Sequence, residues 1–356
     1  MIKKSFLSLI AGIALAGSAL VGCGGDEPPH SSGLVAQMVD SVAATVADHL
    51  DSSRPITQDT PTVDLAYREP LAGVTDVKPF NDVLVKNPLV YAAFDGGIVV
   101  YDLTDQTHRM IPVDDNIKAL TLHASTVMAG GRSLYQLDEN ALTPIDSDFK
   151  GTITDLCSFG SRLMIGTDEG LYARDVLGMK TILEDVPVSA LTAENEEAIW
   201  VGTDGRGLYR WDGDDLNRRY LRRDTTLFDY VTALAFNHAH LYVGTDEAMY
   251  DFNGGSWATV GFEQGLPDGA VLSIDASDWV VYIGTNNGLF SYFNDEIKPV
   301  ERFDAHFVNA LAVSGRRIFA AGGDAGLVMK QGPSYRVLLE APHGDDGDLA
   351  AISMLQ

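Results

Sequence analysis

Apolar residues recur in short clusters along most of the chain, and the clusters come in pairs. The second cluster of each pair ends on a small residue, and successive small residues are 37, 36, 36, 42, 40 and 37 positions apart. These seven positions are Ala93, Gly130, Gly166, Gly202, Gly244, Gly284 and Ala321. A repeat of this period indicates one supersecondary unit that is used seven times and buries its faces against its neighbours.

The first cluster of each pair lies about 13 residues before the small residue and is apolar on both faces of an extended chain. These clusters cover residues 80–83, 117–120, 153–156, 188–191, 231–234, 271–274 and 308–311. Such segments are typical of inner strands that lie between two neighbouring sheets. The second cluster closes on its small residue, where a minimal side chain lets another backbone approach.

A third strand is expected to begin at Gly-Leu-Tyr or its equivalent, and turn formers separate it from a fourth. These are Asp212-Gly213, Asn253-Gly254, Asn294-Asp295 and Gln331-Gly332-Pro333. A solenoid has shorter coils without a hairpin in every unit. We therefore predict an all-β fold, a seven-bladed β-propeller of four-stranded antiparallel blades over residues 62–356, with six or eight blades left open. Residues 62–69 and 349–352 are expected to help close the ring.

The first 23 residues have the pattern of an export signal. Lys3 and Lys4 precede an apolar run over residues 6–21, which is short for a membrane span. This layout predicts a signal peptide over residues 1–22. The sequence Leu20-Val21-Gly22-Cys23 resembles the cleavage box of bacterial lipoproteins, and an ordinary signal peptide with an incidental cysteine is the alternative.

The lipoprotein resemblance implies that Cys23 becomes the mature N-terminus and carries a diacylglycerol, with a further acyl chain on its amine in many organisms. Each buried methylene contributes about 0.8 kcal/mol, so two or three chains anchor a protein stably. Gly24 follows, where Asp would be the usual retention signal for the inner membrane in enteric-type bacteria. The resemblance therefore favours the outer membrane, with the protein facing the periplasm or the cell surface.

Residues 23–61 are predicted to form a lipidated linker that contains one short helix. Gly, Pro and Ser dominate residues 24–33, as in a flexible tether. Over residues 34–50, apolar residues recur at steps of three and four, which predicts an amphipathic helix. Packing against the propeller, docking to a partner and self-association all remain open for this helix.

Two stretches of the repeat resemble known propeller repeats. Residues 163–173 and 199–211 carry the string Val/Ile-Gly-Thr-x-x-Gly-Leu-Tyr or a close variant, which resembles the repeat in periplasmic sensor regions of bacterial two-component regulators. Residues 81–103 look closer to the related LVIVD-type repeat. The resemblance implies the fold and leaves the function open, since one such fold hosts many activities.

The chain is strongly acidic. Its 356 residues include 50 Asp and Glu against 25 Lys and Arg, and removal of Lys3 and Lys4 leaves 50 against 23, or −27. Such a surface repels phosphate backbones, so we expect no nucleic-acid partner. Simple solubility explains the charge, and attraction of cations or of a basic partner is the alternative.

No catalytic motif stands out. The sequence holds no nucleophile elbow, His-Glu-x-x-His helix, phosphate loop or Cys-x-x-Cys pair. We therefore expect no enzyme activity, no catalytic residue, no metal and no cofactor. His238 and His240 alternate without an evident third ligand, and residues 343–348 lack the spacing of a calcium loop. Cys157 lies in an apolar run and is expected to be buried and inert.

One local feature opposes the global charge, because six arginines fall within 18 residues of the fourth repeat. They are Arg206, Arg210, Arg218, Arg219, Arg222 and Arg223. Four of them occupy the expected outermost strand, where charge protects an edge from pairing with another chain. The alternative is a binding site for an acidic protein, an anionic glycan or a lipid headgroup, since arginine binds carboxylate and phosphate with two parallel hydrogen bonds.

The expected function is therefore a membrane-anchored lipoprotein whose propeller is a non-catalytic binding or scaffold module for a protein or glycan partner at the cell envelope. A hydrolase or lyase with its site at the mouth of the central channel is the alternative, because a propeller can bring together residues from several blades. A structural subunit that makes contact through the helix over residues 34–50 is a third hypothesis.

Overall fold

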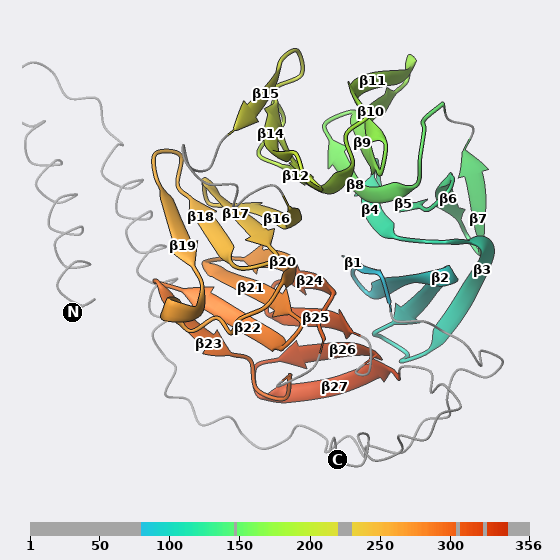
Figure 1. The fold of residues 1–356 in the computed structure, drawn as a ribbon. Helices are drawn as coiled ribbons and strands as arrows, with labels where there is room; N and C mark the ends of the chain where they lie inside the picture. The colour runs from blue at the N-terminus through green and yellow to red at the C-terminus, as the bar shows by residue number, and fades with distance from the viewer. Residues whose placement is uncertain (1–79, 146–147, 220–229, 304–306, 323–325, 341–356) are drawn as a thin grey trace, which may run out of the picture. The chain divides into compact units, whose positions relative to one another are not determined.

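The computed structural model describes residues 80–145, 148–219, 230–303, 307–322 and 326–340, all within one compact unit, Arg68–Gln356. In these residues seven antiparallel sheets follow one another along the chain and stand in a ring (Figure 1). The predicted signal peptide, lipidation site, linker and helix, and the segments 62–69 and 349–352, lie outside the described residues. No helix in the described ranges is long and apolar enough to cross a membrane.

Each sheet is one blade, numbered here in chain order. Blade 1 contains β1 (Asp82–Lys86), β2 (Leu89–Asp102) and β3 (His108–Asn116), and blade 2 contains β4 (Ala119–His123), β5 (Thr126–Gly130), β6 (Leu134–Asp138) and β7 (Ala141–Ile145). Blade 3 contains β8 (Ile153–Phe159), β9 (Arg162–Thr167), β10 (Gly170–Asp175) and β11 (Gly178–Glu184). Blade 4 contains β12 (Val188–Ala193), β13 (Ile199–Thr203), β14 (Gly207–Trp211) and β15 (Leu216–Arg219).

The last three blades repeat the plan. Blade 5 contains β16 (Val231–Asn237), β17 (His240–Thr245), β18 (Met249–Phe252) and β19 (Trp257–Val260), and a short 3-10 helix, η1 (Phe262–Gln264), follows it. Blade 6 contains β20 (Val271–Ser277), β21 (Val280–Thr285), β22 (Gly288–Phe293) and β23 (Glu296–Pro299). Blade 7 contains β24 (Ala310–Ser314), β25 (Arg317–Gly322), β26 (Gly326–Gln331) and β27 (Ser334–Leu339).

The ring closes within the described residues. The first strand of each blade contacts the first strand of the next, in the circular order β1, β4, β8, β12, β16, β20, β24 and back to β1. The seven-bladed prediction is therefore confirmed against six or eight blades, and each predicted inner segment overlaps the first strand of its blade. A core shared by blades 7 and 1 includes Phe80, Val90, Phe319 and Leu338.

Blade 1 reaches the same plan with three strands because β2 turns back on itself. Gly96 and Gly97 have φ of 122° and 147°, a region that side chains disfavour. The Leu103 N–H donates to the Pro88 carbonyl at 3.0 Å, which brings the two ends of β2 together. Its first half pairs with β1 and its second half with β3. The two halves of β2 thus take the places of second and third strands.

The small residue of each repeat makes room for the blade that follows. A Cβ added at Gly166 would lie 2.6 Å from Val188 Cγ1, and one added at Gly244 would lie 2.7 Å from Val271 Cγ1. Both distances are shorter than real Cβ contacts, and both valines are fully buried at the start of the next blade. The prediction that a small residue allows a close approach is confirmed, but at these glycines the neighbour is a side chain rather than a backbone.

Hydrogen bonds join the blades near the same place. In six blades, a side chain at the start of the first strand donates to a carbonyl at the start of the next blade. The donors are Asn81, Thr154, Ser189, Thr232, Ser273 and Asn309, and the acceptors are the carbonyls of Ile117, Val188, Val231, Val271, Val308 and Phe80. The bond from Asn309 to Phe80 joins blade 7 to blade 1. These contacts supplement apolar packing at every boundary that they cross.

The ring has two distinct faces. In an antiparallel meander, the first and third turns lie at one end of the sheet, and the second turn lies at the other. We call the first the first-turn face, which in blade 5 carries the turns 238–239 and 253–256. The opposite linker face carries the turn 246–248 and the connections between blades, such as residues 261–270.

Candidate functional site

All four tryptophans of the chain lie near the first-turn face, in blades 4 to 6. Trp200 is the second residue of β13, Trp211 ends β14 and Trp257 begins β19. Trp279 lies in the turn between β20 and β21. Trp200 and Trp211 are buried, whereas Trp257 is half-buried and Trp279 is exposed, so the last two offer aromatic contact area on the first-turn face.

Two adjacent depressions lie on this face and share Arg210. The first, of about 410 Å³, lies between blades 3 and 4 and is lined by Phe159, Arg162, Glu196, Glu197, Arg210, Asp212 and Gly213. The second, of about 520 Å³, lies between blades 4 and 5 and is lined by Glu194, Trp200, Arg210, Phe236, Ala239, Phe252, Asn253, Gly254 and Trp257. We call the two together the Arg210 groove. Volumes of this size suit a small molecule or a short segment of a larger one.

Arg210 is fixed at the centre of the groove by Glu194. Its Nε donates to Glu194 Oε2 at 2.7 Å, and its Nη2 donates to Glu194 Oε1 at 3.0 Å. The hydrogen bonds that Arg210 donates to the Glu194 carboxylate raise the pKa of the Arg210 guanidinium above its usual value. The guanidinium carbon also lies 6.0 Å from the centre of the Trp200 ring. A paired, stacked arginine keeps a single orientation and offers its remaining donors to a ligand.

Aromatic rings form the wall of the second depression. Trp257 stacks on Phe252 with ring centres 4.5 Å apart, and Trp200 meets the edge of Phe252 at 6.3 Å. Trp200 is only 4% exposed, and its indole Nε1 has no hydrogen-bond partner. A buried donor without a protein partner costs roughly 1–3 kcal/mol.

The first depression combines aromatic and charged groups. Phe159 and Trp211 lie 5.7 Å apart between ring centres, and the Arg162 guanidinium lies 5.6 Å from the Trp211 ring. Arg162 also forms a long ion pair with Asp175, at 4.0 Å. Exposed carboxylates of Glu196 and Glu197 complete the rim. The groove therefore presents apolar ring faces beside positively and negatively charged groups that can form hydrogen bonds.

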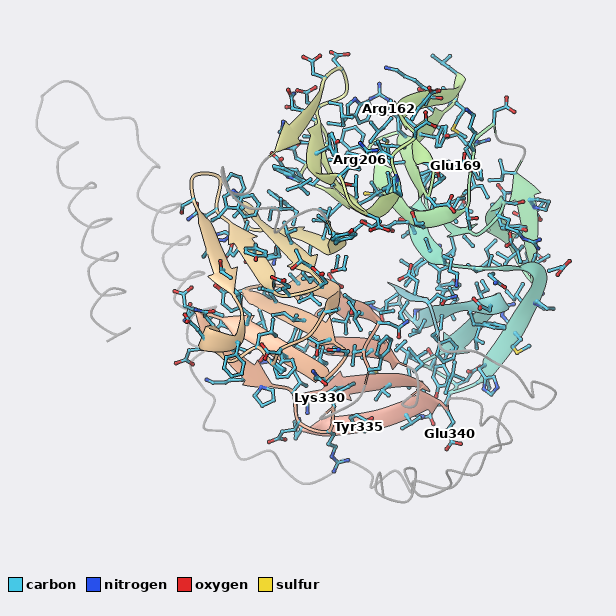
Figure 2. The ribbon with its side chains drawn as sticks, in the orientation of Figure 1. Arg162, Glu169, Arg206, Lys330, Tyr335 and Glu340 are labelled. Carbon is cyan, nitrogen blue, oxygen red and sulfur yellow. The ribbon has the colours of Figure 1, made fainter. Side chains whose placement is uncertain are left out.

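Two of the predicted arginines, Arg206 and Arg210, have described side chains, and of these two Arg210 lines the groove. Arg206 is exposed on the turn between β13 and β14, on the linker face, and Figure 2 labels it together with Arg162 of blade 3. Arg218 and Arg219 belong to β15, while Arg222 and Arg223, like Cys23, lie outside the described residues. Binding of a partner by these arginines stays a prediction, and Glu194 already pairs with Arg210.

The two alternating histidines have separate partners. His240 Nδ1 lies 2.6 Å from Asp251 Oδ1, and the His238 ring stacks on Trp279 with centres 4.1 Å apart. Among the residues that the structure describes, no group of three or more His, Cys, Asp or Glu side chains is placed to hold a metal ion. Burial raises the pKa of the Cys157 thiol to about 12, which fits an inert cysteine, although the residue is half-buried rather than fully buried as predicted.

Three carboxyl groups on first strands were not singled out by the sequence analysis. Asp82, Asp155 and Asp275 accept backbone N–H bonds from Leu120, Leu191 and Val313 of the next blade, each at 2.6 Å. Burial raises their pKa values to about 7, 7 and 6, respectively. A carboxyl group in an otherwise apolar strand was the available signal. Their hydrogen bonds join one blade to the next.

The ring of seven blades defines the chain as a β-propeller, and solved structures share this fold. No protein-family profile and no curated protein matches the chain. The extracellular domain of a putative one-component system from B. thetaiotaomicron has a TM-score of 0.62 and 14% sequence identity, over 71% of this chain and 38% of that chain. The extracellular domain of a putative hybrid two-component system from the same organism gives 0.62 and 14%, over 72% and 39%.

The WD40 β-propeller domain of Doa1 is similar as well, with a TM-score of 0.57 and 11% identity, over 72% of this chain and 95% of that domain. This chain spans about two fifths of the two B. thetaiotaomicron chains. At such low identity, the likeness concerns the fold alone. It confirms at that level the resemblance to propellers of two-component regulators.

Proposed function

We propose that this protein is an envelope lipoprotein, anchored through lipid on Cys23, whose propeller is a non-catalytic module that binds a protein or glycan partner through the Arg210 groove. The observation that carries the binding role is the groove itself, where Trp200, Trp257 and Phe252 stand beside the Arg210–Glu194 pair. Rings offer apolar contact area, and the fixed pair offers donors and acceptors that orient a ligand.

The predicted anchor supports the place of action. A lipidated Cys23 followed by a Gly- and Pro-rich tether would hold the propeller at a membrane surface and leave its faces free. A Cys23→Ser variant tests this part of the proposal. We expect the native chain to incorporate labelled palmitate and to sediment with membranes, and the variant to do neither. A variant that still sediments with membranes would argue against the anchor.

The groove is tested with Trp257→Ala, and Trp257→Phe serves as the matched control because it keeps an aromatic face. Neutral and anionic glycan arrays and crosslinked envelopes are probed with both variants and with the native chain. We expect Trp257→Ala to reduce binding roughly tenfold or more, as for a central aromatic contact, and Trp257→Phe to retain most of it. Equal binding by all three chains, or binding by none, would overturn the assignment of the groove.

A further inference from the structure

Large apolar side chains are exposed on both sides of the Arg210 groove. In the described part of the chain, seven large hydrophobic residues are exposed, and four of them lie on the first-turn face. Val176 and Leu177, which are 97% and 93% exposed, form the turn between β10 and β11 of blade 3. Trp279 and Phe293, which are 68% and 46% exposed, lie at the tip of blade 6. Burial of such residues against a partner would be favourable.

The Trp279 side chain and the turn that carries Leu177 are both ordered before any partner arrives. The Trp279 ring stacks on His238 with an angle of 8° between the ring planes. The turn that carries Leu177 is fixed by a hydrogen bond from the Leu177 N–H to Asp175 Oδ1, at 2.7 Å. Side chains and turns that are already ordered lose less entropy on binding, and tryptophan is enriched among residues that dominate interfaces.

The distribution of the four residues indicates a large partner. A ligand confined to the Arg210 groove would touch blades 3, 4 and 5, and it would leave Trp279 and Phe293 of blade 6 uncovered. The other described blades, 1, 2 and 7, expose no large hydrophobic residue on this face. A surface that reaches from blade 3 to blade 6 has the extent of a protein interface, with anchors at its two ends and a groove between them.

The exposed charges on the first-turn face indicate which kind of partner it attracts. Exposed carboxylates stand beside the apolar residues of blade 6, with Asp278 next to Trp279 and Asp295 two positions after Phe293. Glu196 and Glu197 lie on the rim of the groove, and the whole chain carries a net charge of −25. At blade 6, a partner with basic residues around its apolar contact would be attracted to the carboxylates of Asp278 and Asp295, and an acidic one would be repelled.

We propose that the first-turn face of blades 3 to 6 is the docking surface for a folded protein that has apolar pockets for Leu177 and Trp279, with basic residues around the pocket for Trp279. This inference rests on the proposed binding function and assigns its partner to the proteins rather than the glycans. Leu177 and Trp279 are the outer contacts, and the Arg210 groove is the central one.

Photocrosslinking in intact cells tests the assignment with the full lipidated chain. Leu177, Trp279 and Phe262 are replaced one at a time by the photoreactive amino acid p-benzoylphenylalanine. Phe262 is the matched control, because it is an aromatic residue with 71% exposure that lies on the linker face. All three side chains are exposed, so folding should be preserved, and thermal unfolding checks this. Irradiation should link one and the same polypeptide to positions 177 and 279, and not to position 262.

Substitution adds an independent measurement. Trp279→Ala should lower the yield of the adduct formed at position 177 roughly tenfold, because it removes a distant part of the same interface. Different polypeptides at the two positions, an equal adduct at position 262, or no polypeptide adduct at all would overturn the inference. Glycan binding that is lost in Trp257→Ala but unchanged in Trp279→Ala would also overturn it, while the proposed binding function would stand.

Discussion

Asp155 in blade 3 accepts a hydrogen bond from the backbone N–H of Leu191 in blade 4, at 2.6 Å across the boundary between the two sheets. Its other carboxyl oxygen accepts the N–H of Leu156. Asp82 and Asp275 repeat this arrangement at two further boundaries. A half-buried carboxyl group thus joins neighbouring blades, at the cost of removing a titratable group partly from water.

Stability should depend on pH through these carboxyl groups. Burial raises the pKa of Asp155 from 3.8 to about 7, so between these values the folded state binds a proton that the unfolded state does not. The stabilising contribution is therefore complete below about pH 4 and is lost as pH rises to about 7. Asp82 and Asp275 act with the same sign. Denaturant unfolding at several pH values between 4.5 and 7.5 measures the effect.

The matched variant is Asp155→Asn, which keeps an acceptor for Leu191 and cannot ionise. Its unfolding free energy, relative to the native chain, should increase by about 2 kcal/mol between pH 5 and pH 7.5. Burial lowers the pKa of His123 and so opposes the trend in both chains, and this effect cancels in the difference. Parallel curves for the variant and the native chain would contradict the role given to Asp155.

Two repeats have alanine at the small position, but glycine should be required at Gly166, where Val188 of the next blade packs against it. Gly166→Ala would bring a Cβ to 2.6 Å from Val188 Cγ1, and we expect a loss of roughly 1–3 kcal/mol in the free energy of unfolding. Gly255→Ala is the control, because the nearest atom to its new Cβ lies 3.8 Å away. Val188→Ala should recover part of the loss when combined with Gly166→Ala. Equal losses in the two single variants would refute this account.

The sequence could predict the ring because its signals are local and repeated. In each repeat, an apolar strand packs closely against the next blade. The small residue leaves room for a buried side chain of that blade, as Gly166 does for Val188. The strands of blade 1 were harder to predict, because its second and third strands are the two halves of β2, one continuous strand that folds back at Gly96 and Gly97.

The groove could not be predicted in the same way. Glu194 and Arg210 are 16 residues apart, and the β12–β13 and β13–β14 pairings bring them together. Trp257 reaches the groove from the next blade, so no short motif joins it to Trp200. The local excess of arginine drew attention to the right blade, but it did not reveal which arginine has a carboxylate partner. The grouping of all four tryptophans in blades 4 to 6 was the better signal.

Cys157 should react with thiol reagents only after unfolding. Its raised pKa, about 12, leaves very little thiolate at neutral pH, and the thiolate is the reactive form. In a Cys23→Ser chain at pH 8, an aromatic disulfide reagent should modify native Cys157 roughly a hundredfold or more slowly than the unfolded thiol. The unfolded chain in denaturant is the control. Rapid reaction of the folded chain would show that this thiol is accessible.

The Arg210–Glu194 pair should be much stronger than an ion pair on the open surface. Both side chains are about one fifth to one quarter exposed, with two hydrogen bonds between them, so we expect a double-mutant cycle to give a coupling of roughly 1–3 kcal/mol. Lys298 and Glu296 form the comparison pair at 2.8 Å, and their side chains are 72% and 69% exposed. Their coupling should be below about 1 kcal/mol and should shrink further in 1 M salt, because exposed charges are screened. Similar couplings for the two pairs would mean that Glu194 does not hold Arg210 in the orientation on which the groove depends.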